Sequence, residues 1–119
     1  MDLSQRRKMC RLIAGIVMAD DHFDPREGLF LERLCHDLDL PEADREDLHP
    51  IVEARVAASE MMELPEEVRE ETFVLLLDAV CADGRVMEAE REYLRAVART
   101  MGIAAAETDQ MIALRKSFG

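Results

Sequence analysis

The sequence contains no tryptophan, one tyrosine and four phenylalanines, so aromatic residues make up only 4% of its 119 residues. Aliphatic residues and the eight methionines must therefore fill any core. Leu, Ala, Met and Glu favour helices, whereas aromatic residues are enriched in strands. The shortage of aromatic residues argues against a β-sandwich and favours an all-α protein.

Basic residues are also few: 15 lysines and arginines stand against 26 aspartates and glutamates, and the net charge is −11. Such a charge repels the phosphates of nucleic acids and anionic membrane surfaces, so we expect neither as a partner. No apolar run is long enough to span a bilayer, which predicts no direct membrane insertion. The acidic surface suits cations or a basic protein surface, although acidity often serves solubility alone.

Cysteine occurs three times, without CxxC spacing. Cys10, Cys35 and Cys81 all fall on apolar helical positions, which indicates buried thiols in a reducing compartment, with a redox role as the alternative. The basic and apolar start of the chain lacks the cleavage site of a signal peptide. We therefore expect a cytoplasmic protein.

Apolar residues recur at helical spacing, and no segment alternates with the period of a strand. This pattern predicts a single-domain bundle of six to seven helices over residues 1–119, with either a kink or a break at His49-Pro50. The expected helices cover about residues 4–20, 25–38, 42–48, 50–61, 65–83, 88–101 and 105–117. Ile51, Val52 and Val56 are expected to face the core, as is Leu114.

The first helix has two further features. Gly15 lies off its apolar stripe and would permit the close approach of a neighbour. Basic residues occupy the first turns, where the helix dipole disfavours them: Arg6, Arg7, Lys8 and Arg11. We expect these side chains to pair with the acidic middle of the chain, with a patch that docks a partner as the alternative.

Residues 12–51 align without a gap on residues 75–114, a shift of 63 positions. The identical pairs are Leu12/Leu75, Val17/Val80, Ala19/Ala82, Asp20/Asp83, Glu27/Glu90, Leu31/Leu94 and Ala43/Ala106. Two helical hairpins with the same inward faces pack naturally as halves of one bundle. The repeat therefore predicts a pseudo-twofold arrangement.

Each repeat carries an acidic turn between two helices, with an aspartate before the turn and a glutamate after it. Asp20 and Glu27, like Asp83 and Glu90, continue the apolar stripes, so their carboxylates should face the seam between helices. One interpretation is structural. The aspartates would accept hydrogen bonds from the following turn, and each glutamate would cap its helix from the third position.

The other interpretation is a divalent cation site. Two carboxylates with turn carbonyls suit Ca²⁺ or Mg²⁺. In the first copy Asp24 adds an oxygen ligand, and His22 would allow Zn²⁺. In the second copy, Arg85 brings a competing positive charge.

A resemblance to the tellurite-resistance TerB-like family, whose relatives include the amino-terminal domain of DjlA-type co-chaperones, rests mainly on the second repeat. Its residues are Leu75-Leu76-Leu77-Asp78-Ala79-Val80-Cys81-Ala82-Asp83-Gly84-Arg85-Val86, then Glu90 and Tyr93-Leu94. The resemblance implies an all-helical domain linked to stress and tellurite resistance. It also implies metal binding at Asp20, Glu27, Asp83 and Glu90. The chain departs from the family pattern at Asp21 and Met87.

No nucleophile constellation or phosphate-binding glycine loop accompanies the carboxylates, which argues against an enzyme. We therefore expect a non-enzymatic helical module that acts through a protein partner, with a homodimer as one arrangement. The alternative is a divalent-cation-binding protein that uses the two acidic turns.

Overall fold

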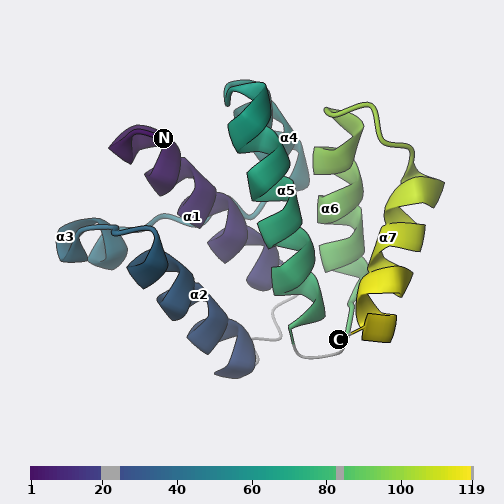
Figure 1. The fold of residues 1–119 in the computed structure, drawn as a ribbon, viewed down its shortest axis with the longest axis horizontal. Helices are drawn as coiled ribbons and strands as arrows, with labels where there is room; N and C mark the ends of the chain where they lie inside the picture. Colours follow the sequence, from purple (N-terminus) through teal and green to yellow (C-terminus); the bar gives the residue numbers. More distant parts are fainter. Residues whose placement is uncertain (20–24, 83–84, 119) are drawn as a thin grey trace.

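The computed structural model describes residues 1–19, 25–82 and 85–118, and no strand occurs among them. Their helices are α1 (Leu3–Val17), α2 (Pro25–Asp37), α3 (Glu42–Glu46), α4 (Ala54–Met62), α5 (Glu66–Cys81), α6 (Glu88–Arg99) and α7 (Ala105–Phe118) (Figure 1). The predicted all-α bundle is confirmed.

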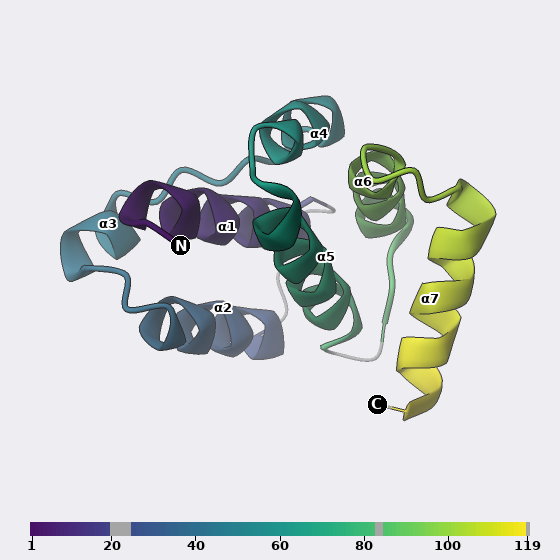
Figure 2. The same cartoon turned by 45° about the horizontal axis from the view of Figure 1, so that its top comes forward.

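The helices form two groups that meet where α1 packs on α5. In the first group α1 packs on α2, and in the second α6 packs on both α5 and α7. Figure 2 shows α4 on one side of the bundle, where it packs against α6. The radius of gyration is 13.1 Å, close to the roughly 13.5 Å expected of a compact domain of this length.

The main core runs without interruption through both groups. Its buried side chains include Leu12, Ile13, Ile16 and Val17 of α1, Leu76 and Val80 of α5, and Leu94 and Val97 of α6. Full burial of such a side chain stabilises the fold by about 1.5–3 kcal/mol. A smaller cluster of Cys10, Cys35 and Leu40 lies apart from this core.

The helix starts follow the predicted repeat. Residues 3, 25 and 42 begin α1, α2 and α3, and residues 66, 88 and 105, each 63 positions later, begin α5, α6 and α7. The packing partners match as well, since α1–α2 corresponds to α5–α6 and α1–α6 corresponds to α5–α2. The helix α4 lies between the two repeats in sequence and has no counterpart in either.

The turns after α2 and α6 are also equivalent. Asp39 has φ 53° and Gly102, 63 positions later, has φ 76°. The Leu40 N–H donates to the Cys35 carbonyl at 3.0 Å, and the Ile103 N–H donates to the Ala98 carbonyl at 3.1 Å. Both helices thus end in the left-handed turn that most often uses glycine.

Gly15 allows the segment before α4 to touch α1. A Cβ at Gly15 would lie 1.8 Å from the Ile51 carbonyl oxygen, so the predicted close approach is confirmed. The Ile51 N–H donates to the Arg11 carbonyl at 3.0 Å. The Tyr93 hydroxyl lies 2.6 Å from the Ile51 carbonyl oxygen and 3.0 Å from that of Leu12.

This junction explains where the sequence prediction was wrong. The helix expected from Pro50 begins only at Ala54, because Ile51 is held against α1. Ile51 is buried as expected, but Val52 and Val56 are 44% and 41% exposed. Leu114, also expected in the core, is 60% exposed.

Two helix ends also differ from the prediction. The first helix ends at Val17 instead of residue 20, and α5 ends at Cys81 instead of residue 83. Each helix therefore stops before the acidic turn that follows it.

Two of the four basic side chains at the start of α1 pair with the acidic middle of the chain as predicted, whereas Arg6 and Arg11 donate to the backbone carbonyls of Leu38 and His49. Arg7 Nη2 lies 2.7 Å from an Asp44 carboxylate oxygen. Lys8 Nζ lies 2.9 Å from Glu60 Oε2 and 2.8 Å from Glu63 Oε2. These pairs fasten α1 to α3 and to the end of α4.

Candidate functional site

The acidic turns are described only in part. Outside the described residues lie Asp20, His22, Asp24 and Asp83. Glu27 belongs to α2, but its side chain is not described. Glu90 is therefore the one proposed cation ligand whose carboxylate has a described position.

Glu90 occupies the third position of α6 and is 2% exposed. Its Oε1 accepts a hydrogen bond from the Met87 N–H at 3.0 Å. This bond satisfies a free amide at the helix start, and the helix dipole favours a negative charge there. The capping role predicted for Glu90 is thus present, and it offsets part of the cost of burying a carboxylate.

The described residues form neither a metal-binding cluster nor a membrane-spanning helix. Within the ranges 1–19, 25–82 and 85–118, no group of three or more His, Cys, Asp or Glu side chains is arranged to hold a metal ion. Within the same ranges, no helix combines the length and apolarity needed to cross a membrane.

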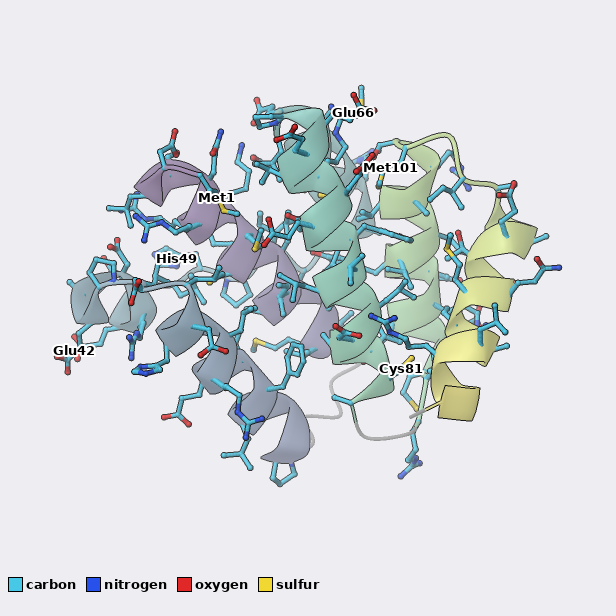
Figure 3. All side chains as sticks on the ribbon, viewed as in Figure 1. Met1, Glu42, His49, Glu66, Cys81 and Met101 are labelled. Carbon is cyan, nitrogen blue, oxygen red and sulfur yellow. The ribbon has the colours of Figure 1, made fainter. Side chains whose placement is uncertain are left out.

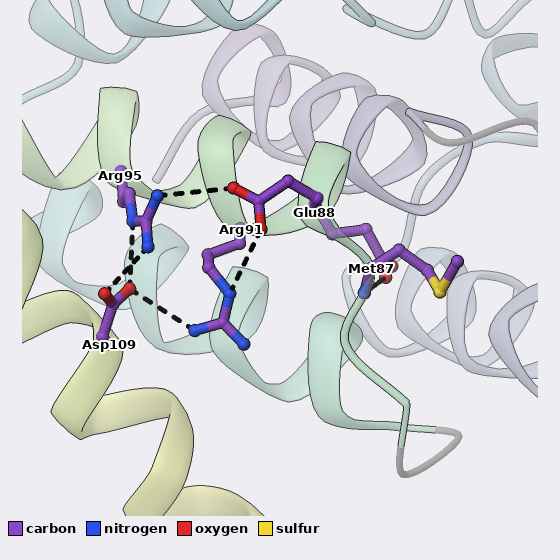
Figure 4. A network of polar contacts seen from close by, with 6 residues as sticks. Met87, Glu88, Arg91, Arg95 and Asp109 are labelled. Atoms are coloured by element: carbon purple, nitrogen blue, oxygen red, sulfur yellow. Dashed lines mark hydrogen bonds and ion pairs between the residues drawn. The ribbon is translucent and has the colours of Figure 1, made fainter.

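A polar network joins α6 to α7 (Figure 4). Arg95 donates from Nε and Nη2 to the two carboxylate oxygens of Asp109, at 3.0 and 2.8 Å. Arg91 Nη1 lies 3.4 Å from Asp109 Oδ1, and Glu88 contacts both arginines. The hydrogen bonds from Arg95 hold the pKa of Asp109 below its usual range. This network fixes the helix pair.

A hollow of about 440 Å³ lies between α4 and α6. Its lining consists of Ala54, Arg55, Ala58, Ala96, Arg99 and Thr100. Small side chains let the two helices approach closely and leave apolar space between the larger side chains of the rim. Arg55 and Arg99 are both exposed at this rim.

A second hollow, of about 310 Å³, lies beside the start of α4. Val52 and Val56 line it together with Arg11, Pro50, Ile51 and Glu53. Two large apolar side chains thus reach solvent beside this hollow, and Met62 is exposed at the end of the same helix. Apolar groups, hollows and arginines thus occur together on the surface of α4, as they also do at a hollow of about 280 Å³ lined by Leu29, Phe30 and Arg33 of α2 with Asp78 and Ala82.

Cys10 in α1 and Cys35 in α2 lie together in the small buried cluster. The neighbouring Cys10 thiol, with a smaller contribution from Arg45, lowers the pKa of Cys35, while burial opposes it. The neighbouring Cys35 thiol and burial raise the pKa of Cys10.

Cys81 has a different environment at the end of α5 (Figure 3). It is half-buried, and burial raises its pKa, although Arg115 acts in the opposite direction. Cys81 therefore remains a protonated thiol under conditions in which Cys35 ionises.

Neither the hollow nor the thiol pair was predicted as a site from the sequence. The spacing of Ala54 and Ala58 is a weak signal of a close helix contact, but nothing in the sequence shows that Ala96 faces them. Compared with protein-family models, curated proteins and solved structures, the chain matches none. A function must therefore be argued from the surface of this fold.

Proposed function

We propose that this chain is a non-enzymatic, cytoplasmic helical module of the TerB-like kind. It binds an acidic, amphipathic helix of a partner protein in the hollow between α4 and α6. The observation that carries the proposal is the apolar floor of this hollow with two exposed arginines at its rim. The resemblance of residues 75–94 to the TerB-like family supports a stress-response setting.

The chemistry of the hollow defines its occupant. The methyl groups of Ala54, Ala58 and Ala96 offer an apolar floor to a leucine- or methionine-sized side chain. Burying such a side chain contributes about 1.5–3 kcal/mol. Arg55 and Arg99 stand on opposite helices of the rim, so carboxylates on either side of an apolar stripe would meet one arginine each. This is the pattern of an acidic helix seated in a groove.

Only the local charge at the hollow, and not the charge of the whole chain, favours an acidic partner. The net charge of −11 repels an acidic helix from most of the surface. The two arginines provide local attraction, which steers the partner to the hollow and sets its orientation. Such binding should weaken as ionic strength rises, because exposed charges are screened beyond about 8–10 Å at 0.1–0.15 M salt.

The proposal is tested by affinity capture from the native cell with the wild-type chain and two matched variants. The test variant is Arg55→Glu/Arg99→Glu. The control variant, Arg33→Glu/Lys116→Glu, makes the same change in net charge at exposed positions on α2 and α7. Far-UV circular dichroism checks that both variants keep their helices.

We expect one partner that the wild-type chain and the control retain at 0.15 M salt and that the test variant loses. Its binding segment, measured as a synthetic peptide, should bind the test variant at least ten times more weakly than wild type. Equal binding to both variants, or a partner segment that is basic, would contradict the proposal. If the captured protein is the chain itself, the hollow is a homodimer contact and the partner assignment is wrong.

Divalent cation binding at the acidic turns is the second candidate function. The observation that favours it is the nearly complete burial of the Glu90 carboxylate beside the second turn. Ca²⁺, Mg²⁺ or Zn²⁺ would be held by Glu90 with Asp83, and in the first copy by Asp20, Asp24 and Glu27, with His22 added for Zn²⁺.

Calorimetric titration of chelator-stripped protein with each ion tests this candidate. We expect binding heat from wild type, and at least a tenfold weaker affinity after Asp83→Asn/Glu90→Gln, because a neutral amide binds a hard cation poorly. Glu88→Gln is the matched control, since Glu88 is exposed at the same helix start. If wild type gives only the heat of dilution, cation binding is wrong for both turns.

A further inference from the structure

Cys10 and Cys35 form a thiol pair that the proposed function does not use. Cys10 is fully buried and Cys35 is 4% exposed. They face each other from α1 and α2, in a cluster completed by Leu40 and flanked by the half-buried Leu31 and Leu38. The two thiols thus belong to one buried cluster between helices that pack on each other, and a disulfide requires their sulfurs to approach to about 2 Å.

We propose that Cys10 and Cys35 are a redox-active pair that closes reversibly to an intramolecular disulfide when the protein meets hydrogen peroxide. The described parts of the chain place no third His, Cys, Asp or Glu beside these two thiols in a metal-binding group. Two facing thiols without further ligands favour redox chemistry.

The reaction proceeds in two balanced steps. The Cys35 thiolate attacks one oxygen of the peroxide, the O–O bond breaks, and one proton completes a departing water, leaving Cys35 as a sulfenic acid. The Cys10 sulfur then attacks the Cys35 sulfur. The S–S bond forms, the S–O bond breaks, and the hydroxyl leaves as a second water with the Cys10 proton. Two thiols are oxidised by two electrons, and one hydrogen peroxide is reduced to two waters.

The surroundings assign the roles within the pair. The thiolate is the reacting form of a cysteine, and the neighbouring Cys10 thiol and the Arg45 charge lower the pKa of Cys35. Cys10 keeps its proton and so acts second, as the resolving thiol.

Residues 38–48, which include Leu40 of the cluster, are held to the rest of the chain partly by polar contacts. The helix α3, which forms part of residues 38–48, buries none of its own side chains. Arg6 Nη1 donates to the Leu38 carbonyl at 3.0 Å, and Arg45 Nε donates to the Leu40 carbonyl at 2.9 Å. Both hydrogen bonds are part-buried, and breaking them in a local opening would leave the main core intact. A molecule as small as hydrogen peroxide reaches Cys35 in this way.

Peptide mapping of the full chain tests the proposal. Folded wild-type protein is treated with a small excess of hydrogen peroxide, then unfolded in urea with N-ethylmaleimide and digested with trypsin. Cleavage follows Lys8, Arg11, Arg33 and Arg45. We expect a disulfide between the peptides of residues 9–11 and 34–45. The mass of the linked peptides should be two hydrogens less than the summed masses of the two reduced peptides. Cys81, in the peptide of residues 70–85, should carry the maleimide. If dithiothreitol is added to the oxidised protein before N-ethylmaleimide, it should reduce the disulfide, and all three cysteines should then carry the maleimide.

Variants and an unfolded control separate the pair from random oxidation. Cys81→Ser should form the same disulfide. Cys10→Ser should stop at a Cys35 sulfenic acid that dimedone traps. In the folded chain the yield of the Cys10–Cys35 disulfide should be at least ten times that of either disulfide with Cys81. When the oxidation is done in urea, the three disulfides should form in more nearly equal yields.

Two results would overturn the inference without depending on any variant. One is wild-type protein in which Cys10 and Cys35 both take up maleimide after peroxide treatment. The other is a set of disulfides that join separate chains.

Discussion

Tyr93 is the single tyrosine of a chain without tryptophan, and it lies at the junction of α6, α1 and the segment before α4. Its hydroxyl proton lies between two carbonyl oxygens, where a negative phenolate would be repelled. Burial raises the pKa of Tyr93 above its ordinary value of 10.0. The packing of these three segments therefore depends on whether the Tyr93 hydroxyl is protonated.

This coupling has a measurable consequence at alkaline pH. Because the folded chain holds the Tyr93 proton more tightly than the unfolded chain does, stability is full below pH 10 and falls as the pH rises above it. Absorbance at 295 nm reports Tyr93 alone. We expect tyrosinate to appear only together with the loss of helical circular dichroism.

Protein unfolded in urea is the control, and its tyrosine should titrate near pH 10. A smooth titration near that value with helicity intact would show that the hydroxyl is not held at this junction.

The helix ends provide a second prediction, at the scale of elements. Asp39 and Gly102 hold equivalent left-handed positions after α2 and α6, but Asp39 carries a Cβ. Asp39→Gly should raise the free energy of unfolding by about 0.5–1 kcal/mol, since the relief of strain exceeds the added entropy of the unfolded chain. Gly102→Ala should lower it by about 1 kcal/mol. No atom lies within 4 Å of the Cβ it would add, so this cost comes from the backbone alone.

Urea denaturation of both variants beside wild type measures these changes. The repeat requires opposite signs at the two positions. Changes of the same sign would mean that the two turns are not equivalent.

The same elements show what the sequence could and could not predict. The helices and their 63-residue repeat were predictable, because amphipathic periodicity is local and survives in both copies. The exposure of Val52 was not, since the hydrogen bond between Ile51 and Arg11 that keeps residues 51–53 out of a helix joins residues far apart in sequence. The contact of Cys10 with Cys35 depends likewise on how α1 and α2 pack.

At the scale of the whole molecule, the two repeats share one core. Leu12 and Ile16 of the first repeat are buried in the same cluster as Leu76 and Leu94 of the second. We therefore predict that residues 1–63 and residues 64–119, prepared as separate fragments, each show little helix, because either fragment alone would expose half of this core.

Mixing the fragments should restore helical circular dichroism and a cooperative thermal transition. A fragment that unfolds cooperatively on its own would show that the repeats are separate folding units.

Because Tyr93 contacts a residue far away in sequence, the fold cannot be completed during synthesis until Tyr93 has been made. Its hydroxyl binds the Leu12 carbonyl across 81 residues of sequence. At a ribosomal rate of about 5–20 residues per second, α1 waits roughly 4–16 seconds for this partner. Throughout that interval its apolar stripe lacks α5 and α6, so the nascent chain is open to chaperones and to wrong contacts until its second half emerges.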